Sequence, residues 1–172
     1  PNPVSGNWTV SFVQGGPQLP ASITVDSLGS WTDFVGDEYK AFSGTAVYTT
    51  TINKVPVADV IKLDLGSVAE NASVYLNGDY IGTVIDSPYQ LYIPAEKFKG
   101  QDELVVRVAN SMANRIAYMD KKGVDWKIFY NVNMSARKKE NVKNGIFDAS
   151  DWEPKSSGLL GPVTLTPAMV KQ

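Results

Sequence analysis

The stretch Leu63–Val84, LDLGSVAENASVYLNGDYIGTV, decides the predicted fold. At its centre, Asn77-Gly78 separates two runs in which apolar and polar residues alternate. Because both residues of this pair tolerate a positive φ, they favour a two-residue type I′ turn. The stretch therefore predicts a β-hairpin.

A two-residue turn also fixes the register of the hairpin, because a slip by one residue would exchange the two faces of the sheet. It predicts Val74 opposite Ile81 and Tyr75 opposite Tyr80, and opposite residues share a face. The predicted core face holds Ala72, Val74, Leu76 and Ile81, and the other face holds Ser73, Tyr75 and Tyr80.

Short alternating segments recur on both sides of the hairpin. We count about nine strands, with turn signals roughly every 8–12 residues and no convincing amphipathic helix. This pattern is typical of an all-β protein with an antiparallel β-sandwich or jelly roll. Outside the hairpin, strands are predicted in or near Trp8–Val13, Ile23–Val25, Ala46–Ile52, Ile61–Leu65, Tyr89–Ile93, Leu104–Val108 and Val163–Leu165.

Composition narrows the classes of function. The chain has 172 residues, enough for one domain with a sizeable core, and it carries 16 basic and 18 acidic residues. A net charge near zero gives no electrostatic reason to expect nucleic acid or an anionic membrane as a partner. No apolar run approaches the roughly 20 residues of a membrane-spanning helix, so we expect no membrane insertion.

Cysteine and histidine do not occur in the sequence. Without cysteine there are no disulfides, thiolate metal sites or cysteine nucleophiles. Without histidine, Ser-His-Asp catalysis and histidine-ligated zinc are excluded. The chain begins Pro-Asn-Pro, with neither Met nor a signal peptide, which indicates a processed protein or an excised piece of a longer one.

Residues 111–157 differ from the rest of the predicted domain, which spans residues 1–172. The strand pattern weakens there over a length well beyond the ~12–15 residues of an ordinary loop. We call this segment the excursion. It is rich in aromatic residues, and short strands such as Lys127–Val132 are expected in it. It is therefore interpreted as a functional surface or as a cover over one end of the sandwich.

Several motifs occur in order along the chain, from about Trp31 to Leu165. Together they resemble the galactose-binding-like jelly-roll domain of glycoside hydrolases. The resemblance is closest to the C-terminal domain of family 106 α-L-rhamnosidases and more distant to the sugar-binding domain of family 2 β-galactosidases. The motifs are FSGTAVY at 42–48, LDLGSVAENASVYLNG at 63–78, SPY at 87–89, the strand pattern at 100–110, NRI at 114–116 and SGLLGPVTL at 157–165.

The resemblance implies a non-catalytic accessory domain of a polysaccharide-degrading enzyme. Such enzymes are typically bacterial and exported to the periplasm, the cell surface or the medium. Their catalytic carboxylates lie on a separate (β/α) barrel, for which this chain is too short. The implied partners are that barrel and a plant or bacterial polysaccharide glycan. Three functions stay open: a sugar-binding domain, a purely structural domain that docks on the barrel without sugar contact and, least favoured, a free-standing hydrolase.

Asn114 and Arg115 match an Asn-Arg pair of the family just after a strand end. An amide beside a planar guanidinium can hydrogen-bond sugar hydroxyls. The alternative is that Arg115 ties the excursion to the sandwich by bonding backbone carbonyls.

Three aromatic residues of the excursion are candidates for sugar binding, because the C–H faces of sugars stack on aromatic rings. These are Tyr118, Trp126 and Trp152. The alternative for Tyr118 and Trp126 is that their rings plug one end of the sandwich, and for Trp152 that it anchors a loop or the core.

The excursion also supplies five carboxylates, but no catalytic residue is assigned. A glycosidase needs two carboxyl groups about 5–5.5 Å or roughly 6.5–9.5 Å apart, and sequence does not give that separation. No cofactor is expected, although related jelly rolls often hold a structural Ca²⁺ on oxygen ligands. The basic run Arg137-Lys138-Lys139 is more typical of a solvated loop tip than of a site that attracts an acidic polysaccharide such as a pectin. The five acids are Asp120, Asp125, Asp148, Asp151 and Glu153.

Overall fold

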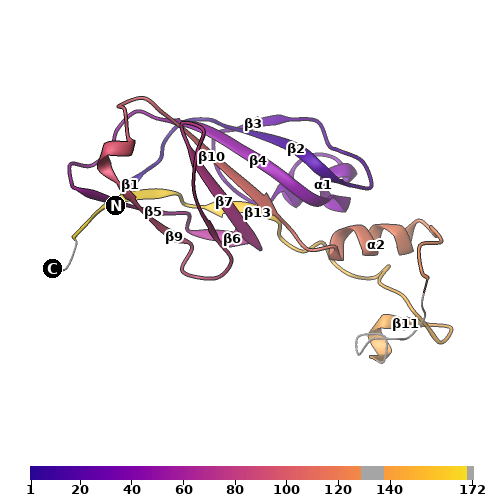
Figure 1. The fold of residues 1–172 in the computed structure, drawn as a ribbon. Coiled ribbons are helices and arrows are strands. Elements are labelled where there is room, and N and C mark those ends of the chain that lie inside the picture. The colour runs from indigo at the N-terminus through magenta and orange to yellow at the C-terminus, as the bar shows by residue number, and fades with distance from the viewer. Residues whose placement is uncertain (129–137, 170–172) are drawn as a thin grey trace.

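The computed structural model describes residues 1–128 and 138–169, and in this part of the chain two antiparallel sheets pack as a β-sandwich (Figure 1). This confirms the predicted fold class. The larger sheet has the strand order β3 (Ile23–Val25), β2 (Trp8–Gly16), β4 (Ser43–Ile52), β10 (Asp102–Ala109), β7 (Asn71–Leu76) and β8 (Asp79–Val84).

The smaller sheet covers one face of the larger one. Its strand order is β1 (Asn2–Pro3), β14 (Thr164–Ala168), β5 (Val60–Asp64) and β9 (Gln90–Pro94). Two further pairs are short: β13 (Gly158–Gly161) with β6 (Ser67–Ala69), and β11 (Val142–Lys143) with β12 (Ile146–Phe147).

The core lies between the two sheets. Because side chains alternate along a strand, every second residue of these strands points into the core. On the central strand β10, Leu104, Val106 and Val108 are fully buried, whereas Glu103 and Arg107 are exposed. β5 contributes Ile61 and Leu63 from the facing sheet. The predicted strands at Leu104–Val108 and Ile61–Leu65 are therefore confirmed.

The hairpin forms as predicted, with one correction. Asn77 and Gly78 have φ values of 52° and 85°, as a type I′ turn requires, and Tyr75 pairs with Tyr80. The predicted pairing of Val74 with Ile81 is wrong, because the register shifts there and Val74 pairs with Gly82. Ile81 is the extra residue of a β-bulge, although it still packs against the core as expected.

The expectation that the chain has no amphipathic helix is also wrong. The described residues contain α1 (Asp37–Ala41) and α2 (Ala113–Lys121), together with the 3₁₀ turns η1 (Trp31–Asp33), η2 (Ala95–Lys97) and η4 (Lys139–Asn141). α1 and η1 belong to the segment after β3, which aromatic residues pin to the core. Within it Trp31 is fully buried, 5.6 Å from the ring centroids of Phe12 and Phe42.

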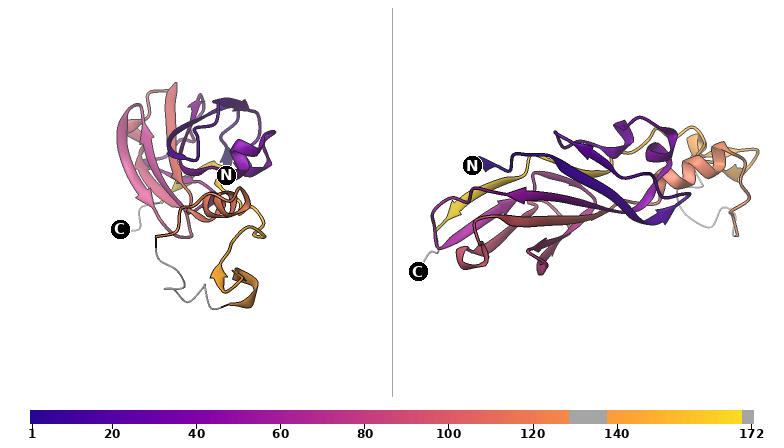
Figure 2. Two further views of the ribbon diagram at one scale, coloured as in Figure 1. Left: turned by 90° about the vertical axis from the view of Figure 1, so that its right-hand side faces the viewer. Right: turned by 90° about the horizontal axis from the view of Figure 1, so that it is seen from above.

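The excursion projects from one end of the sandwich. Figure 1 and the right-hand view of Figure 2 both place α2 and the β11–β12 pair at the end opposite the N-terminus. β1 pairs antiparallel with β14, so the last strand finishes beside the N-terminus, at the end of the sandwich away from α2. No helix among the described residues is long and apolar enough to cross a membrane.

Candidate functional site

A surface groove of about 550 Å³ lies where the excursion meets the sandwich. One wall is α2 with the adjoining α1, and the other is the segment Ser150–Pro154. Three of the five predicted site residues line it, namely Asn114, Tyr118 and Trp152. Arg115 and Trp126 do not.

Helix α2 is the element that positions the groove, and its C-terminus is sharply defined. Gly123 has a φ of 67°, its N–H donates to the Asp120 carbonyl at 3.1 Å, and the Val124 N–H donates to the Met119 carbonyl at 2.9 Å. This pair of bonds is a Schellman motif, which ends a helix on a left-handed glycine. Lys121-Lys122-Gly123 was therefore the sequence signal for the helix that the strand analysis missed.

Asn114 supports the groove wall rather than offering its polar atoms to a ligand. It is 5% exposed, donates to the Lys155 carbonyl at 2.9 Å and accepts from the Lys155 N–H at 2.8 Å. Asn110 reaches the same segment through the Ser157 hydroxyl at 2.9 Å. These amides join the ends of β10 and α2 to the chain that enters β13.

Arg115 packs back onto the sandwich. Its guanidinium covers Gly16, where an added Cβ would lie 2.7 Å from Cζ, and its backbone N–H donates to the Ser43 hydroxyl at 3.1 Å. Among the described residues its buried Nε has no hydrogen-bond partner. Arg115 thus lies outside the groove, against the end of β2.

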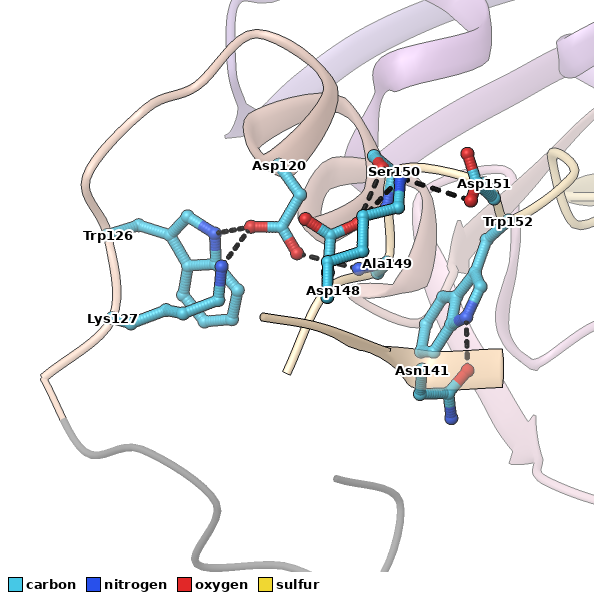
Figure 3. Close-up of polar contacts among 10 residues, drawn as sticks. Asp120, Trp126, Lys127, Asn141, Asp148, Ala149, Ser150, Asp151 and Trp152 are labelled. Atoms are coloured by element: carbon cyan, nitrogen blue, oxygen red, sulfur yellow. Dashed lines mark hydrogen bonds and ion pairs between the residues drawn. The ribbon is translucent and has the colours of Figure 1, made fainter. Parts of the chain in front are cut away.

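Trp126 is held by a buried carboxylate (Figure 3). The Asp120 side chain is 1% exposed; it accepts from the Trp126 indole N–H at 2.7 Å, from the Lys127 ammonium at 2.5 Å and from the Ala149 N–H at 2.8 Å. Lys127 also lies 5.1 Å from the centroid of the Trp126 ring. Asp120 therefore joins the end of α2 to both later segments of the excursion.

Tyr118 and Trp152 are the aromatic side chains of the groove, and both are half-buried. The Lys122 ammonium lies 5.8 Å from the centroid of the Tyr118 ring. The Trp152 indole N–H donates to the Asn141 side-chain carbonyl at 2.9 Å, and its ring packs edge-on to Phe147 at 5.8 Å. Trp152 also borders a second hollow, of about 510 Å³, on the side of Glu140.

The acids of the excursion are tied mainly to lysines and to backbone. The Lys143 ammonium lies 3.0 Å from Asp151 and 3.3 Å from Asp148, and the Asp151 bond raises the pKa of Lys143. Hydrogen bonds from the Ser150 hydroxyl and N–H, aided by Lys143, hold the pKa of Asp148 below its usual range. A general acid of a glycosidase needs the opposite shift.

The remaining candidate residues lie at the surface or outside the described residues. Asp125 and Glu153 are exposed, as are Lys138 and Lys139 of the basic run. Arg137 lies outside the described residues, as does most of the predicted strand Lys127–Val132. Within the described residues no group of three or more acidic side chains is placed to hold a metal ion. The groove is lined by two aromatic side chains together with charged side chains of both signs.

Known proteins resemble this chain in sequence and in fold. No protein-family model matches the sequence. The chain is 32% identical over 182 residues to a Formosa agariphila protein named "Putative beta-glucuronidase", and the match covers 96% of this chain and 16% of that protein.

Parts of solved glycoside hydrolase structures also resemble this chain. A rhamnosidase from Novosphingobium sp. PP1Y matches with a TM-score of 0.71 and 30% identity, over 95% of this chain and 14% of the enzyme. The β-glucuronidase of Ruminococcus gnavus matches with a TM-score of 0.50 and 22% identity, over 63% of this chain and 21% of that enzyme. The second likeness concerns the fold alone.

The chain is thus similar to an accessory domain of large glycoside hydrolases, as the sequence predicted. It spans about one sixth of the curated relative and one seventh of the Novosphingobium rhamnosidase.

Proposed function

We propose that this chain is a non-catalytic, sugar-binding domain of a larger polysaccharide-degrading glycoside hydrolase resembling α-L-rhamnosidases. The parent enzyme would be bacterial and exported, and it would carry its catalytic carboxylates on a separate barrel. The observation that carries the proposal is the groove in which Tyr118 and Trp152 come together from distant parts of the sequence. Half-buried aromatic rings with charged neighbours are suited to stacking and orienting a sugar.

The acids of the excursion support a binding role over a hydrolytic one. Asp120 is buried among three donors, Asp151 is paired with Lys143, and Asp148 has a lowered pKa. The lowered pKa of Asp148 is the opposite of the raised pKa that a general acid requires, and Asp120 and Asp151 are engaged by neighbouring donors. We therefore assign no catalytic residue to this chain.

A second candidate function is a structural domain that docks on the catalytic barrel without sugar contact. It is favoured by the internal bonds of Asn114 and Trp126, whose polar atoms hold the excursion together. In that case the excursion would be a rigid arm shaped to fit the barrel.

Glycan titration followed by amide NMR separates the two functions. The probes are rhamnose-containing oligosaccharides and plant pectin fragments. Sugar binding predicts weak, saturable shifts of amides in α2 and in Ser150–Pro154 that are lost in Tyr118→Ala. The matched control is Tyr92→Ala, since Tyr92 is 62% exposed on β9 in the smaller sheet, outside the groove.

Three other results would count against the proposal. No shift at millimolar sugar, together with binding of the chain to the purified barrel of its parent enzyme, would favour docking. Shifts that persist in Tyr118→Ala would place the sugar elsewhere. Release of reducing ends by the isolated chain would show that it is an enzyme.

A further inference from the structure

The outer face of the six-stranded sheet carries a second group of side chains suited to a ligand. This face lies away from the smaller sheet and is separate from the groove. Strand pairing aligns its residues in rows: Thr9, Thr49, Val105, Tyr75 and Tyr80 form one row, and Ser11, Val47, Arg107, Ser73 and Thr83 form the next.

The bulge at Ile81 shapes one end of this face. In a regular strand, residues 80 and 83 would point to opposite faces, because side chains alternate. The extra residue brings Tyr80 and Thr83 to the same face, and the Tyr80 hydroxyl lies 2.9 Å from the Thr83 hydroxyl. Bulges re-aim side chains in this way, often beside functional sites.

Two further contacts order the same group. The Thr83 hydroxyl lies 2.7 Å from the Ser73 hydroxyl, and the rings of Tyr75 and Tyr80 pack with centroids 5.5 Å apart at 60°. Tyr80 is nevertheless 59% exposed, so its ring remains accessible. We call Tyr75, Tyr80, Ser73, Thr83 and Arg107 the tyrosine platform.

Arg107 supplies the charge of the platform. It is exposed, lies directly across from Ser73 and is diagonal to Tyr75, which places the tyrosine about 7–8 Å away. No ion pair or side-chain hydrogen bond joins Arg107 to another described residue. Glu103 lies on the same face of β10, roughly 13 Å along the strand from Arg107. It is also diagonal to Tyr75, but on the side away from Ser73.

Strand propensity accounts for part of this face, since threonine and valine favour sheets. Strand propensity does not account for the bulge at Ile81, which brings Tyr75 and Tyr80 to the same face as the bonded hydroxyls of Ser73 and Thr83. It also does not account for Arg107 beside them, which forms no ion pair with another described residue. Accessible rings can stack on sugar C–H faces, hydroxyls can exchange hydrogen bonds with sugar hydroxyls, and a guanidinium binds a carboxylate through two parallel bonds.

We propose that the tyrosine platform binds a glycan segment that contains a uronic acid, with the sugar carboxylate on Arg107 and a neighbouring sugar ring on Tyr80. Charge complementarity decides the occupant on the Ser73–Thr83 side of the platform, because Arg107 lies in that row and is positive, whereas Glu103 lies on the far side of Tyr75. This site is independent of the groove, and it would hold even if the groove bound no sugar.

Amide NMR of the full chain tests the proposal with two matched probes. These are a short oligogalacturonide and the same oligosaccharide with its carboxylates methyl-esterified. The charged probe should shift amides of β7, β8 and β10 with an affinity in the millimolar range, and the neutral probe should bind about tenfold more weakly. Arg107→Gln should reduce the affinity for the charged probe by a similar factor.

Two other variants locate the site. Tyr80→Ala should weaken the binding of both probes about three- to tenfold, because stacking of a sugar ring on the tyrosine does not require charge. Lys62→Gln, on the outer face of the smaller sheet, is the matched charge control and should leave binding unchanged. Arg107 and Tyr80 are exposed and Lys62 is half-buried, and thermal unfolding would verify that each variant folds.

Several results would overturn the proposal. Equal binding of both probes would remove the role of the carboxylate. Shifts confined to α2 and Ser150–Pro154 would assign the sugar to the groove and not to the platform. No shift of β7, β8 or β10 by either probe, or specific binding of a protein partner through Arg107 in place of sugar, would exclude a glycan site on this face.

Discussion

The sandwich and the excursion are stabilised by different kinds of contact. In the sandwich, apolar side chains from two sheets fill a continuous core, with Val10, Leu104 and Val106 at 0% exposure. In the described part of the excursion, before the chain returns to Ser157, the buried residues are Asn114, Asn141 and Ala149. Apolar burial stabilises the sandwich, whereas hydrogen bonds and ion pairs hold the excursion.

This difference matters for function. A net hydrogen bond contributes only about 1 kcal/mol, so a polar network orders a segment without making it as stable as a packed core. Regions of that kind open locally before the whole domain unfolds. The sandwich should therefore act as a rigid support, and the groove should be the part that a single substitution can loosen.

The largest expected effect is in the core of the sandwich. Leu104→Ala should lower the free energy of unfolding by about 3 kcal/mol, because it removes buried methyl groups and leaves a cavity. Urea denaturation measures the change. The matched control is the next residue, Val105→Ala, which points to the outer face and should cost less than about 1 kcal/mol. Equal losses would contradict the assignment of faces on β10.

The second largest effect is expected when the buried carboxylate of Asp120 is removed from the excursion. Asp120→Asn should weaken the bonds to Lys127, Trp126 and Ala149 and cost roughly 1–3 kcal/mol locally. Hydrogen exchange of the Ala149 amide should quicken, while protection of β10 amides stays the same. Asp125→Asn, at an exposed carboxylate, is the control. Loss of protection throughout the sandwich would show that the two regions are not separable.

A smaller effect is expected at the end of α2. Gly123→Ala should cost about 1 kcal/mol, because alanine is strained at a φ of 67° although no atom lies within 4 Å of the added Cβ. Exchange of the last α2 amides reports the loss. Gly29→Ala is the control, since that position also has open space but no positive φ. An unchanged helix end would argue against the Schellman motif.

The smallest effect concerns pH. Because the pKa of Asp148 is lower in the folded chain, its contribution to stability is present above its unfolded pKa of about 3.9 and is lost as the pH falls further. The protection of the Ser150 amide from hydrogen exchange, relative to its intrinsic rate at each pH, should therefore fall below about pH 4. Asp148→Asn should abolish this pH dependence, while leaving exchange in β10 as it was.

The sequence predicted the sandwich well because the strand signals are local. Alternation on β10 and β5, and the Asn77-Gly78 turn, each require only a few neighbouring residues. The bulge at Ile81 could not be predicted, because it depends on a contact between distant strands: an added Cβ at Gly82 would lie 2.9 Å from Leu91 of β9.

The candidate site was predicted only in part. Three of the candidate residues, Asn114, Tyr118 and Trp152, line the groove at the excursion, but their different roles were not visible in the sequence. Asn114 and Trp126 are engaged by Lys155 and by Asp120, and those pairings join segments far apart in sequence. Whether a polar residue faces a ligand or a neighbouring segment is decided by such contacts.

The antiparallel pairing of β1 with β14 brings the two ends of the described chain together, away from α2. A tag or surface linker attached at either end would therefore leave both the groove and the arm that forms it pointing outward. Immobilised in this orientation, the chain can be presented to soluble glycans, to insoluble fibres or to a purified barrel without its attachment point blocking access.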